Sequence, residues 1–117
     1  MERIKELKLK DLQQIAEKVL VDYAEFFKSA MKDSHHEFVF DRSRNSFVLL
    51  EIGWENRRRI HQLVIHLEII NNKIWIQEDH TEEGIAVDLE RLGVSKSQIV
   101  LAFHNPEIRQ YTEYAIT

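Results

Sequence analysis

Apolar and polar side chains alternate with a period of two between Glu37 and Asp79, and this pattern constrains the fold more than any other feature of the chain. Alternation is typical of strands with one buried face, because successive side chains point to opposite sides of a sheet. The strand-like segments are "EFVFD", "SFVLLEIGW", "RIHQLVIHLEII" and "KIWIQED". They predict an antiparallel meander through the middle of the chain.

A two-residue turn at Asn71-Asn72 fixes how the last two segments pair. Asparagine tolerates the positive φ that both central positions of a tight hairpin require. The resulting register places apolar residues opposite each other on a core face: Ile69 with Ile74, and Leu67 with Ile76. The other face pairs Glu68 with Trp75 and His66 with Gln77. This second face mixes apolar and charged side chains, so a second subunit or a partner protein is a candidate to cover it.

The core face is predicted to continue into the earlier hairpin. Val48, Leu50 and Ile52 are assigned to it, opposite Leu63 and Ile65 through a turn near residues 55–56. An antiparallel sheet with one apolar face needs a cover, and a long helix is the natural one.

An apolar stripe at three- and four-residue spacing predicts that helix over the N-terminal third of the chain. The stripe consists of Leu12, Ile15, Ala16, Val19, Leu20, Tyr23, Phe26, Phe27 and Ala30. Asp11 and Gln14 have the spacing of a capping box, although a start near Glu2 is an alternative. The polar residues 32–34 end the helix, and the stripe is expected to pack on the sheet.

A second, shorter helix is predicted in "TEEGIAVDLERLGV". Thr81 is a favourable N-cap, and Glu82 and Glu83 then lie in the first turn, where the helix dipole favours negative charge. Gly93 stands where a left-handed residue ends a helix, which lets Val94 close on the preceding turn.

Two strand-like segments close the chain, "IVLAF" before Pro106 and "YTEYAI" after it. A length of 117 residues fits one domain. The predicted fold class is therefore α+β, a single domain over residues 1–117. A long N-terminal helix packs on an antiparallel β-meander and is followed by a second helix and short C-terminal strands.

Composition excludes several classes of function. The chain has no cysteine, which excludes disulfides, thiol catalysis and thiolate zinc sites. Its apolar runs are too short to span a bilayer and no secretory signal is recognisable, so we expect a cytoplasmic protein. A net charge of −4 argues against a protein whose main task is to bind phosphate backbone, but leaves room for a local basic patch.

Asp79, His80, Glu82 and Glu83 form the densest group of potential metal ligands. Neighbours in a strand point to opposite faces, and adjacent helical residues lie about 100° apart, so these side chains do not converge on one point. Capping explains the group without a ligand, and we expect no metal and no cofactor. A metal-assisted enzyme that uses Asp79, His80 and His104 is the weakest of the alternatives.

The sequence carries no pattern for covalent catalysis. The serines and threonines lack a glycine-framed elbow, and Gly53, Gly84 and Gly93 are too scattered to form a phosphate-binding loop. We therefore assign no catalytic residue and expect a protein that is not an enzyme.

Arg57, Arg58 and Arg59 form the main basic concentration, close to Trp54. At period two, Arg58 points away from its two neighbours, so the triplet is not one patch. It fits a solvated hairpin end whose charges discourage edge pairing, and the alternative is a site for an acidic partner or nucleic acid.

Several motifs occur in the order found in one protein family. They are Gly53-Trp54 with Arg58, "KIWIQ" at 73–77, "TEEGIA" at 81–86, and Phe103-His104, Pro106 and Arg109 with "YTE" at 111–113. Through these motifs the chain resembles the XisI family, whose members are controlling factors for excision of the fdxN DNA element in cyanobacteria. The resemblance covers residues 36 to 117, and is weaker around "VLVDYAEF" in the long helix.

The resemblance implies an accessory role in programmed DNA rearrangement, in which a separate recombinase cuts and joins. It also implies a partner, an XisH-like protein that resembles a nuclease fold. The residues expected to contact a partner are Trp54, Arg58, His66, Trp75, His104 and Arg109. Direct DNA binding through residues 57–59, in the manner of a directionality factor, is the second hypothesis.

Overall fold

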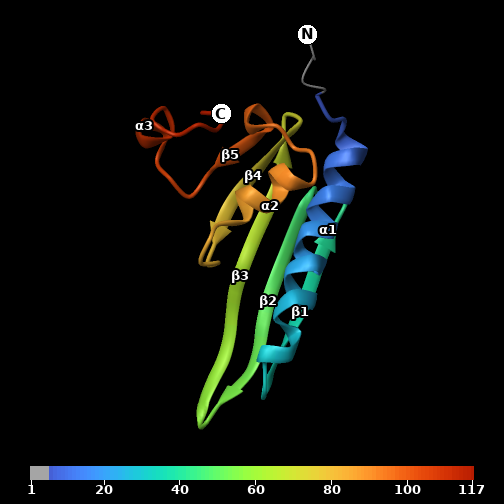
Figure 1. Ribbon diagram of the computed structural model, residues 1–117, viewed down its shortest axis with the longest axis vertical. Coiled ribbons are helices and arrows are strands. Elements are labelled where there is room, and N and C mark those ends of the chain that lie inside the picture. Colours follow the sequence, from blue (N-terminus) through green and yellow to red (C-terminus); the bar gives the residue numbers. More distant parts are fainter. Residues whose placement is uncertain (1–5) are drawn as a thin grey trace.

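The computed structural model describes residues 6–117, which form one five-stranded sheet with helices packed against it. The elements are α1 (Leu9–Phe27), η1 (Lys28–Ala30), β1 (Ser34–Asp41), β2 (Ser46–Glu55), β3 (Arg58–Ile70), β4 (Lys73–Asp79), α2 (Ile85–Arg91), η2 (Lys96–Gln98), β5 (Ile99–Leu101) and α3 (Pro106–Arg109). The strands lie in the order β1-β2-β3-β4-β5 (Figure 1). The first four are antiparallel and β5 is parallel to β4, so the α+β prediction is confirmed and the sheet is mixed.

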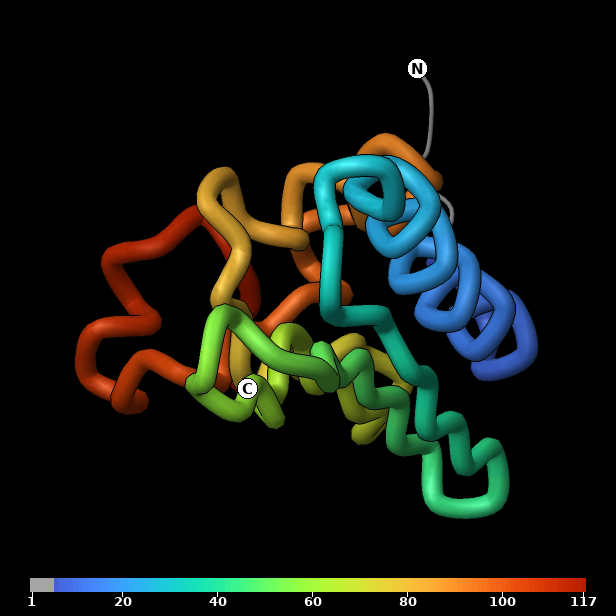
Figure 2. Tube along the Cα trace, turned by 90° about the horizontal axis from the view of Figure 1, so that it is seen from below, coloured from blue at the N-terminus to red at the C-terminus, as the bar shows by residue number. Residues whose placement is uncertain are grey.

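The long helix α1 lies on one side of the sheet, together with α2 (Figure 2). Its buried residues are Leu12, Ala16, Val19, Leu20 and Ala24, and Ile15 and Tyr23 pack partly buried against the core, so the first part of the predicted stripe is confirmed. The stripe fails at its end, because the side chain of Phe26 is 78% exposed. The capping prediction was wrong: the helix begins at Leu9, and Asp11, in the first turn, accepts a hydrogen bond from the backbone N–H of Lys8 at 3.3 Å. The alternative start near Glu2 lies outside the described residues.

The core lies between α1, α2 and one face of the sheet. Its fully buried strand residues are Phe47, Leu49, Ile65, Leu67, Ile74, Ile76 and Ile99. The prediction for β2 was therefore wrong, because Phe47 and Leu49 face the helix, whereas Val48, Leu50 and Ile52 point to the other side and stay partly exposed. Both sets are apolar, so alternation alone does not identify which face is covered.

Two irregularities in the ladder explain where the predicted register holds and where it fails. The Asn71-Asn72 hairpin is confirmed, with φ of 50° and 60° at its two central residues. Its predicted pairs Ile69–Ile74, Leu67–Ile76 and Glu68–Trp75 are observed. A bulge then shifts His66 opposite Glu78 instead of Gln77. A second bulge leaves Val64 unpaired between the pairs Leu49–Ile65 and Leu50–Leu63, which places both Val64 and Ile65 in the core.

The hairpin of β2 and β3 makes the molecule long, with extents of 54 × 29 × 28 Å. Its tip extends past the end of α1 (Figure 1). Asn56 takes the positive φ of 58° that the tight turn needs. Gly53 lies where β1 comes closest, since a Cβ there would stand only 2.4 Å from the Cα of Ser34.

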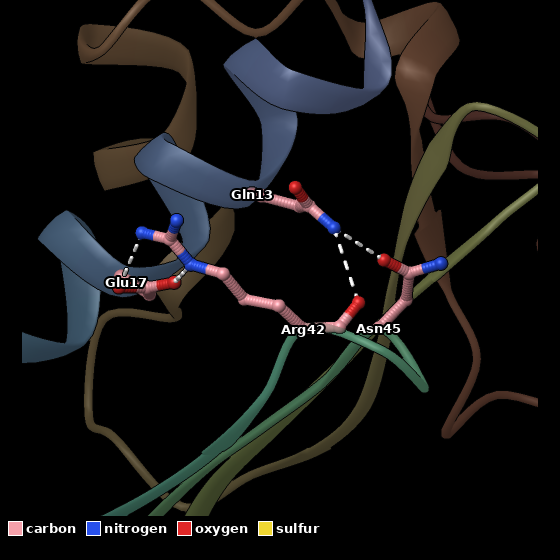
Figure 3. A network of polar contacts seen from close by, with 4 residues as sticks. All are labelled: Gln13, Glu17, Arg42 and Asn45. Atoms are coloured by element: carbon pink, nitrogen blue, oxygen red, sulfur yellow. Dashed lines mark hydrogen bonds and ion pairs between the residues drawn. The ribbon is translucent and has the colours of Figure 1, made fainter.

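At the opposite end of the sheet, four side chains fix α1 to the turn between β1 and β2 (Figure 3). The amide of Gln13 donates to the Asn45 side chain at 2.8 Å and to the carbonyl of Arg42 at 3.2 Å. The guanidinium of Arg42 pairs with Glu17. These contacts orient the helix over the sheet.

The second helix starts later than predicted. Thr81 is not its N-cap: α2 begins at Ile85, whose backbone N–H donates to the carboxylate of Asp79 at 2.7 Å. Thr81 instead accepts a bond from the N–H of Gly84 at 3.1 Å, so Glu82 lies in a loop before the helix. The predicted C-terminus is confirmed.

At the C-terminal end of α2, Gly93 has φ of 104°, and the N–H of Val94 donates to the carbonyl of Leu89 at 3.1 Å.

Of the predicted C-terminal strands, residues 99–101 form β5, whereas "YTEYAI" contributes only a bridge between Ala115 and Val100. Within residues 6–117, no helix combines the length and the apolar composition needed to cross a membrane.

Candidate protein-interaction surface

The side of the sheet that faces away from α1 carries a continuous row of apolar side chains. We call this row the open face; its members are Val39, Val48, Leu50, Ile52, Trp54 and Leu63. Both α1 and α2 lie on the other side of the sheet (Figure 2). Val39 is 54% exposed and Trp54 is 51% exposed, and the remaining members are partly exposed. Contiguous apolar surface of this kind marks binding sites in folded proteins.

Polar residues border the open face. His35 and His61 both pair with Ile52, one on each side, and Glu37 pairs with Leu50. An apolar centre with a polar rim is the usual anatomy of a protein–protein interface.

The hairpin tip supplies an aromatic and arginine pair. The guanidinium carbon of Arg59 lies 5.1 Å from the ring centroid of Trp54, and its Nη1 donates to the carbonyl of Gly53 at 3.3 Å. Arg58 forms an ion pair with Glu55 at 2.9 Å. Among the described residues, Arg57 has neither an ion pair nor a side-chain hydrogen bond, so its charge faces solvent. Arg58 and Arg59 have different partners, in agreement with the prediction that their side chains point to opposite faces of the strand.

The C-terminal segment covers the other end of the same side of the sheet. Arg109 lies over the Trp75 ring, 5.4 Å from its centroid. Its guanidinium donates to the backbone carbonyls of His104 at 2.9 Å, Ala102 at 3.0 Å and Ile116 at 3.4 Å. The indole N–H of Trp75 is buried and has no hydrogen-bond partner within residues 6–117. Arg109 and Trp75 therefore hold this segment in place.

A polar cluster fixes the segment to α2. The Tyr114 hydroxyl donates to Glu90 at 2.8 Å, and Lys96 pairs with both Glu90 and Glu113. The hydrogen bond from Tyr114 and then the one from Lys96 lower the pKa of the Glu90 carboxyl. Burial and the bond to Glu90 raise the pKa of the Tyr114 phenol.

The structure brings the six expected partner residues into two groups. At the C-terminal segment Arg109 contacts both the Trp75 ring and the backbone carbonyl of His104, and Trp54 and Arg58 share the hairpin tip. His66 belongs to neither group. It lies on β3 between the two groups, and its Nε2 is 3.1 Å from the hydroxyl of Ser46 on β2. Sequence reasoning missed Val48, Leu50 and Ile52, because their alternation matched a core face equally well.

Within the acidic group at 79–83, the side chains of Asp79 and His80 form local contacts. Besides the N–H of Ile85, Asp79 accepts both the N–H and the hydroxyl of Thr81, at 2.9 and 2.6 Å. His80 lies 3.0 Å from Glu78. No three histidine, aspartate or glutamate side chains of residues 6–117 are grouped in a way that would hold a metal ion.

The comparisons with known proteins agree with this architecture. The family model described as XisI protein matches residues 7–116. A XisI-like protein from Anabaena variabilis has a solved structure that is 34% identical in sequence, with a TM-score of 0.85; the match covers 94% of this chain and 100% of that one. The fdxN element excision controlling factor XisI from the same organism is 28% identical, with a TM-score of 0.79 over 93% of this chain and 98% of that one. No curated protein matches the chain.

Proposed function

The chain belongs to the XisI family, and we propose that it controls excision of a DNA element by binding another protein. The controlling-factor role is that of the similar protein from Anabaena variabilis. The family resemblance implies that the partner is an XisH-like protein. In this proposal the chain is not an enzyme, and a separate recombinase performs the cutting and joining.

The open face is the observation that carries the proposal. β2 is apolar on both faces, but only the face toward α1 is buried within this chain. The apolar side chains of the other face remain in contact with water unless a second protein covers them. Burial of apolar area at about 25 cal/mol per Å² is the main favourable term in protein association. A partner that covers Leu50, Ile52 and Leu63 would complete a second core.

The hairpin tip supplies the residues best suited to dominate the affinity. Tryptophan and arginine are over-represented among the few side chains that carry most of the binding energy at interfaces. Trp54 already stacks with Arg59, so both are ordered before binding and lose less conformational entropy on association. Trp75 and Arg109 would contribute at the other end, where the C-terminal segment meets the sheet.

Co-purification tests this proposal. Tagged protein is co-expressed with the XisH-like partner, and we expect the two to elute as one complex. Trp54→Ala should reduce the captured partner about tenfold or more, as loss of an interface hot spot does. Phe38→Ala is the matched control, since Phe38 is an exposed aromatic that pairs with Leu49 and so lies on the α1 side of the sheet, away from the open face. Absence of a complex with the wild type, or equal capture by Trp54→Ala, overturns the proposal.

Direct DNA binding is the second candidate, favoured by the projecting hairpin tip and the solvent-facing Arg57. Titration against duplex DNA at several salt concentrations separates it from the first. Phosphate contacts give an affinity that falls steeply with salt, so absence of binding at about 50 mM salt rules this candidate out.

A further inference from the structure

A groove of about 660 Å³ lies on the helix side of the molecule, between α1, α2 and the loop that joins β4 to α2. One wall is the end of the α1 stripe, where the Phe27 ring lies 4.7 Å from that of Tyr23 and 5.0 Å from that of Phe26, between ring centroids. Phe26 is the most exposed aromatic of this wall, so its ring is available to a bound molecule. The stripe was expected to pack on the sheet; Tyr23 does pack against the core, whereas Phe26 and Phe27 are exposed.

The other walls of the groove carry negative charge. Asp22, Glu82, Glu83 and Asp88 line it, and Arg91 is the one arginine or lysine among its lining residues in the described chain. Arg91 and Asp88 form an ion pair at 3.2 Å and Asp22 pairs with Lys18 at 3.1 Å, so the uncompensated negative charge of the groove is that of Glu82 and Glu83. Glu82 and Glu83 form no ion pair within residues 6–117, because the loop before α2 holds them outside the helix cap.

The groove continues into a second hollow of about 430 Å³, with Tyr23 and His80 lining both. Glu51 and Glu78 line this second part. Because Tyr23 lines both hollows, the pKa of its phenol reflects the electrostatic potential in both. Burial raises the pKa of its phenol, and the charges of Asp79, Glu51 and Glu82 raise it further. A potential that opposes a phenolate favours a cation at the same place.

We propose that this groove binds a lysine- or arginine-containing segment of the partner protein, with a cationic side chain seated on the Phe26 ring between the carboxylates of Glu82 and Glu83. The inference rests on the proposed function, because it names the chemistry of a second contact with that partner. An aromatic face attracts a cation through its quadrupole, and neighbouring carboxylates complete the neutralisation. The same carboxylates repel phosphate, which excludes nucleic acid as the occupant of this groove.

The groove and the open face lie on opposite sides of the sheet, so a partner that engages both would wrap around the hairpin. The two contacts also differ in physical character. The open face binds by apolar burial and is insensitive to salt, whereas the groove binds through charge and weakens as salt rises.

A hexalysine peptide tests the groove on the isolated protein by ¹⁵N NMR titration. We expect chemical shift changes confined to the backbone of the groove and a dissociation constant that rises with salt. Phe26→Ala and the double variant Glu82→Gln/Glu83→Gln should each weaken binding about three- to tenfold. All three positions are exposed, so the fold should persist.

The control variants distinguish specific binding in the groove from non-specific electrostatic binding of the cationic peptide to the acidic protein. Glu25→Gln/Glu107→Gln removes the same charge from exposed positions outside the groove, and Phe103→Ala removes an exposed aromatic elsewhere; both should leave binding within about twofold. Trp54→Ala should leave hexalysine binding unchanged while it lowers partner capture, so the groove and the proposed function fail independently. Shifts spread over the surface, or equal losses in the control variants, overturn the inference.

Discussion

The two faces of the sheet differ in burial far more than in composition. Along β2, Phe47 and Leu49 point toward α1 and have no exposed surface, whereas Val48, Leu50 and Ile52 point away and stay partly exposed. Both rows are apolar. The difference shows that the position of the helix, and not the hydrophobicity of the strand, decides which row becomes the core. The other row is left as a surface that a partner can use.

Truncation of one leucine on each face should sharpen this comparison most. Leu67→Ala empties a fully buried site and should lower the free energy of unfolding by about 2–5 kcal/mol. Leu50→Ala removes a side chain that water already contacts, and should lower it by about 1 kcal/mol or less. Urea denaturation followed by circular dichroism measures both. Equal losses would mean that the open face is part of the stabilising core.

The close approach at Gly53 gives the next largest effect. A Cβ there would stand 2.3 Å from the carbonyl oxygen of Asp33 and 2.4 Å from the Cα of Ser34, both backbone atoms. Gly53→Ala should therefore displace the start of β1 and destabilise the protein by about 1–3 kcal/mol. Thermal unfolding measures the loss. A Gly53→Ala variant as stable as the wild type would show that β1 shifts without penalty.

Asp79 anchors the helix-side end of β4 and should give a smaller effect. Both of its carboxylate oxygens accept hydrogen bonds, one from Thr81 and the other from the N–H of Ile85. Asp79→Asn retains one acceptor only and should cost about 1–2 kcal/mol in a urea titration. Glu82→Gln, in the loop between them, should change the unfolding free energy by less than about 0.5 kcal/mol. A larger loss for Glu82→Gln than for Asp79→Asn would restore the helix cap predicted from sequence.

The smallest effect concerns the C-terminal segment that covers one end of the open side. The lowered pKa of Glu90 means that its carboxylate stabilises the folded state above the ordinary pKa of 4.5, and that this contribution is lost as pH falls through the lowered folded-state value. Hydrogen exchange at Tyr114 should therefore quicken, relative to its intrinsic rate, as pH falls through this range. Glu90→Gln should remove the pH dependence. A variant that keeps the wild-type profile would place the anchor elsewhere.

Sequence reasoning succeeded where local chemistry determines structure. The Asn71-Asn72 turn fixed the pairing of β3 and β4 because its positive φ values permit only a tight hairpin. Gly93 marked the end of α2 for the same reason. The α+β class followed from the change of period along the chain. In each case one or two residues carry a conformational preference that the rest of the fold does not override.

It failed where the outcome depends on distant contacts. The bulge that leaves Val64 unpaired has no local signature, and without it the faces of β2 and β3 cannot be matched. Thr81 and Asp79 are both good caps, and the choice depended on which of the two side chains reached the backbone N–H of Ile85. The sequence did indicate a partner surface on the side of the sheet that carries Trp75, but not that Val48, Leu50 and Ile52 belong to it. The aromatic groove was not predicted, since it is defined by what does not cover it.

Paired measurement of stability and partner capture for Leu50→Thr/Ile52→Thr tests the central claim most directly. Threonine keeps the preference for a strand while it removes apolar surface from the open face. The account predicts an unfolding free energy within about 1–2 kcal/mol of the wild type and loss of the XisH-like partner on co-purification. Undiminished capture of the partner, or destabilisation as large as that of Leu67→Ala, would contradict it.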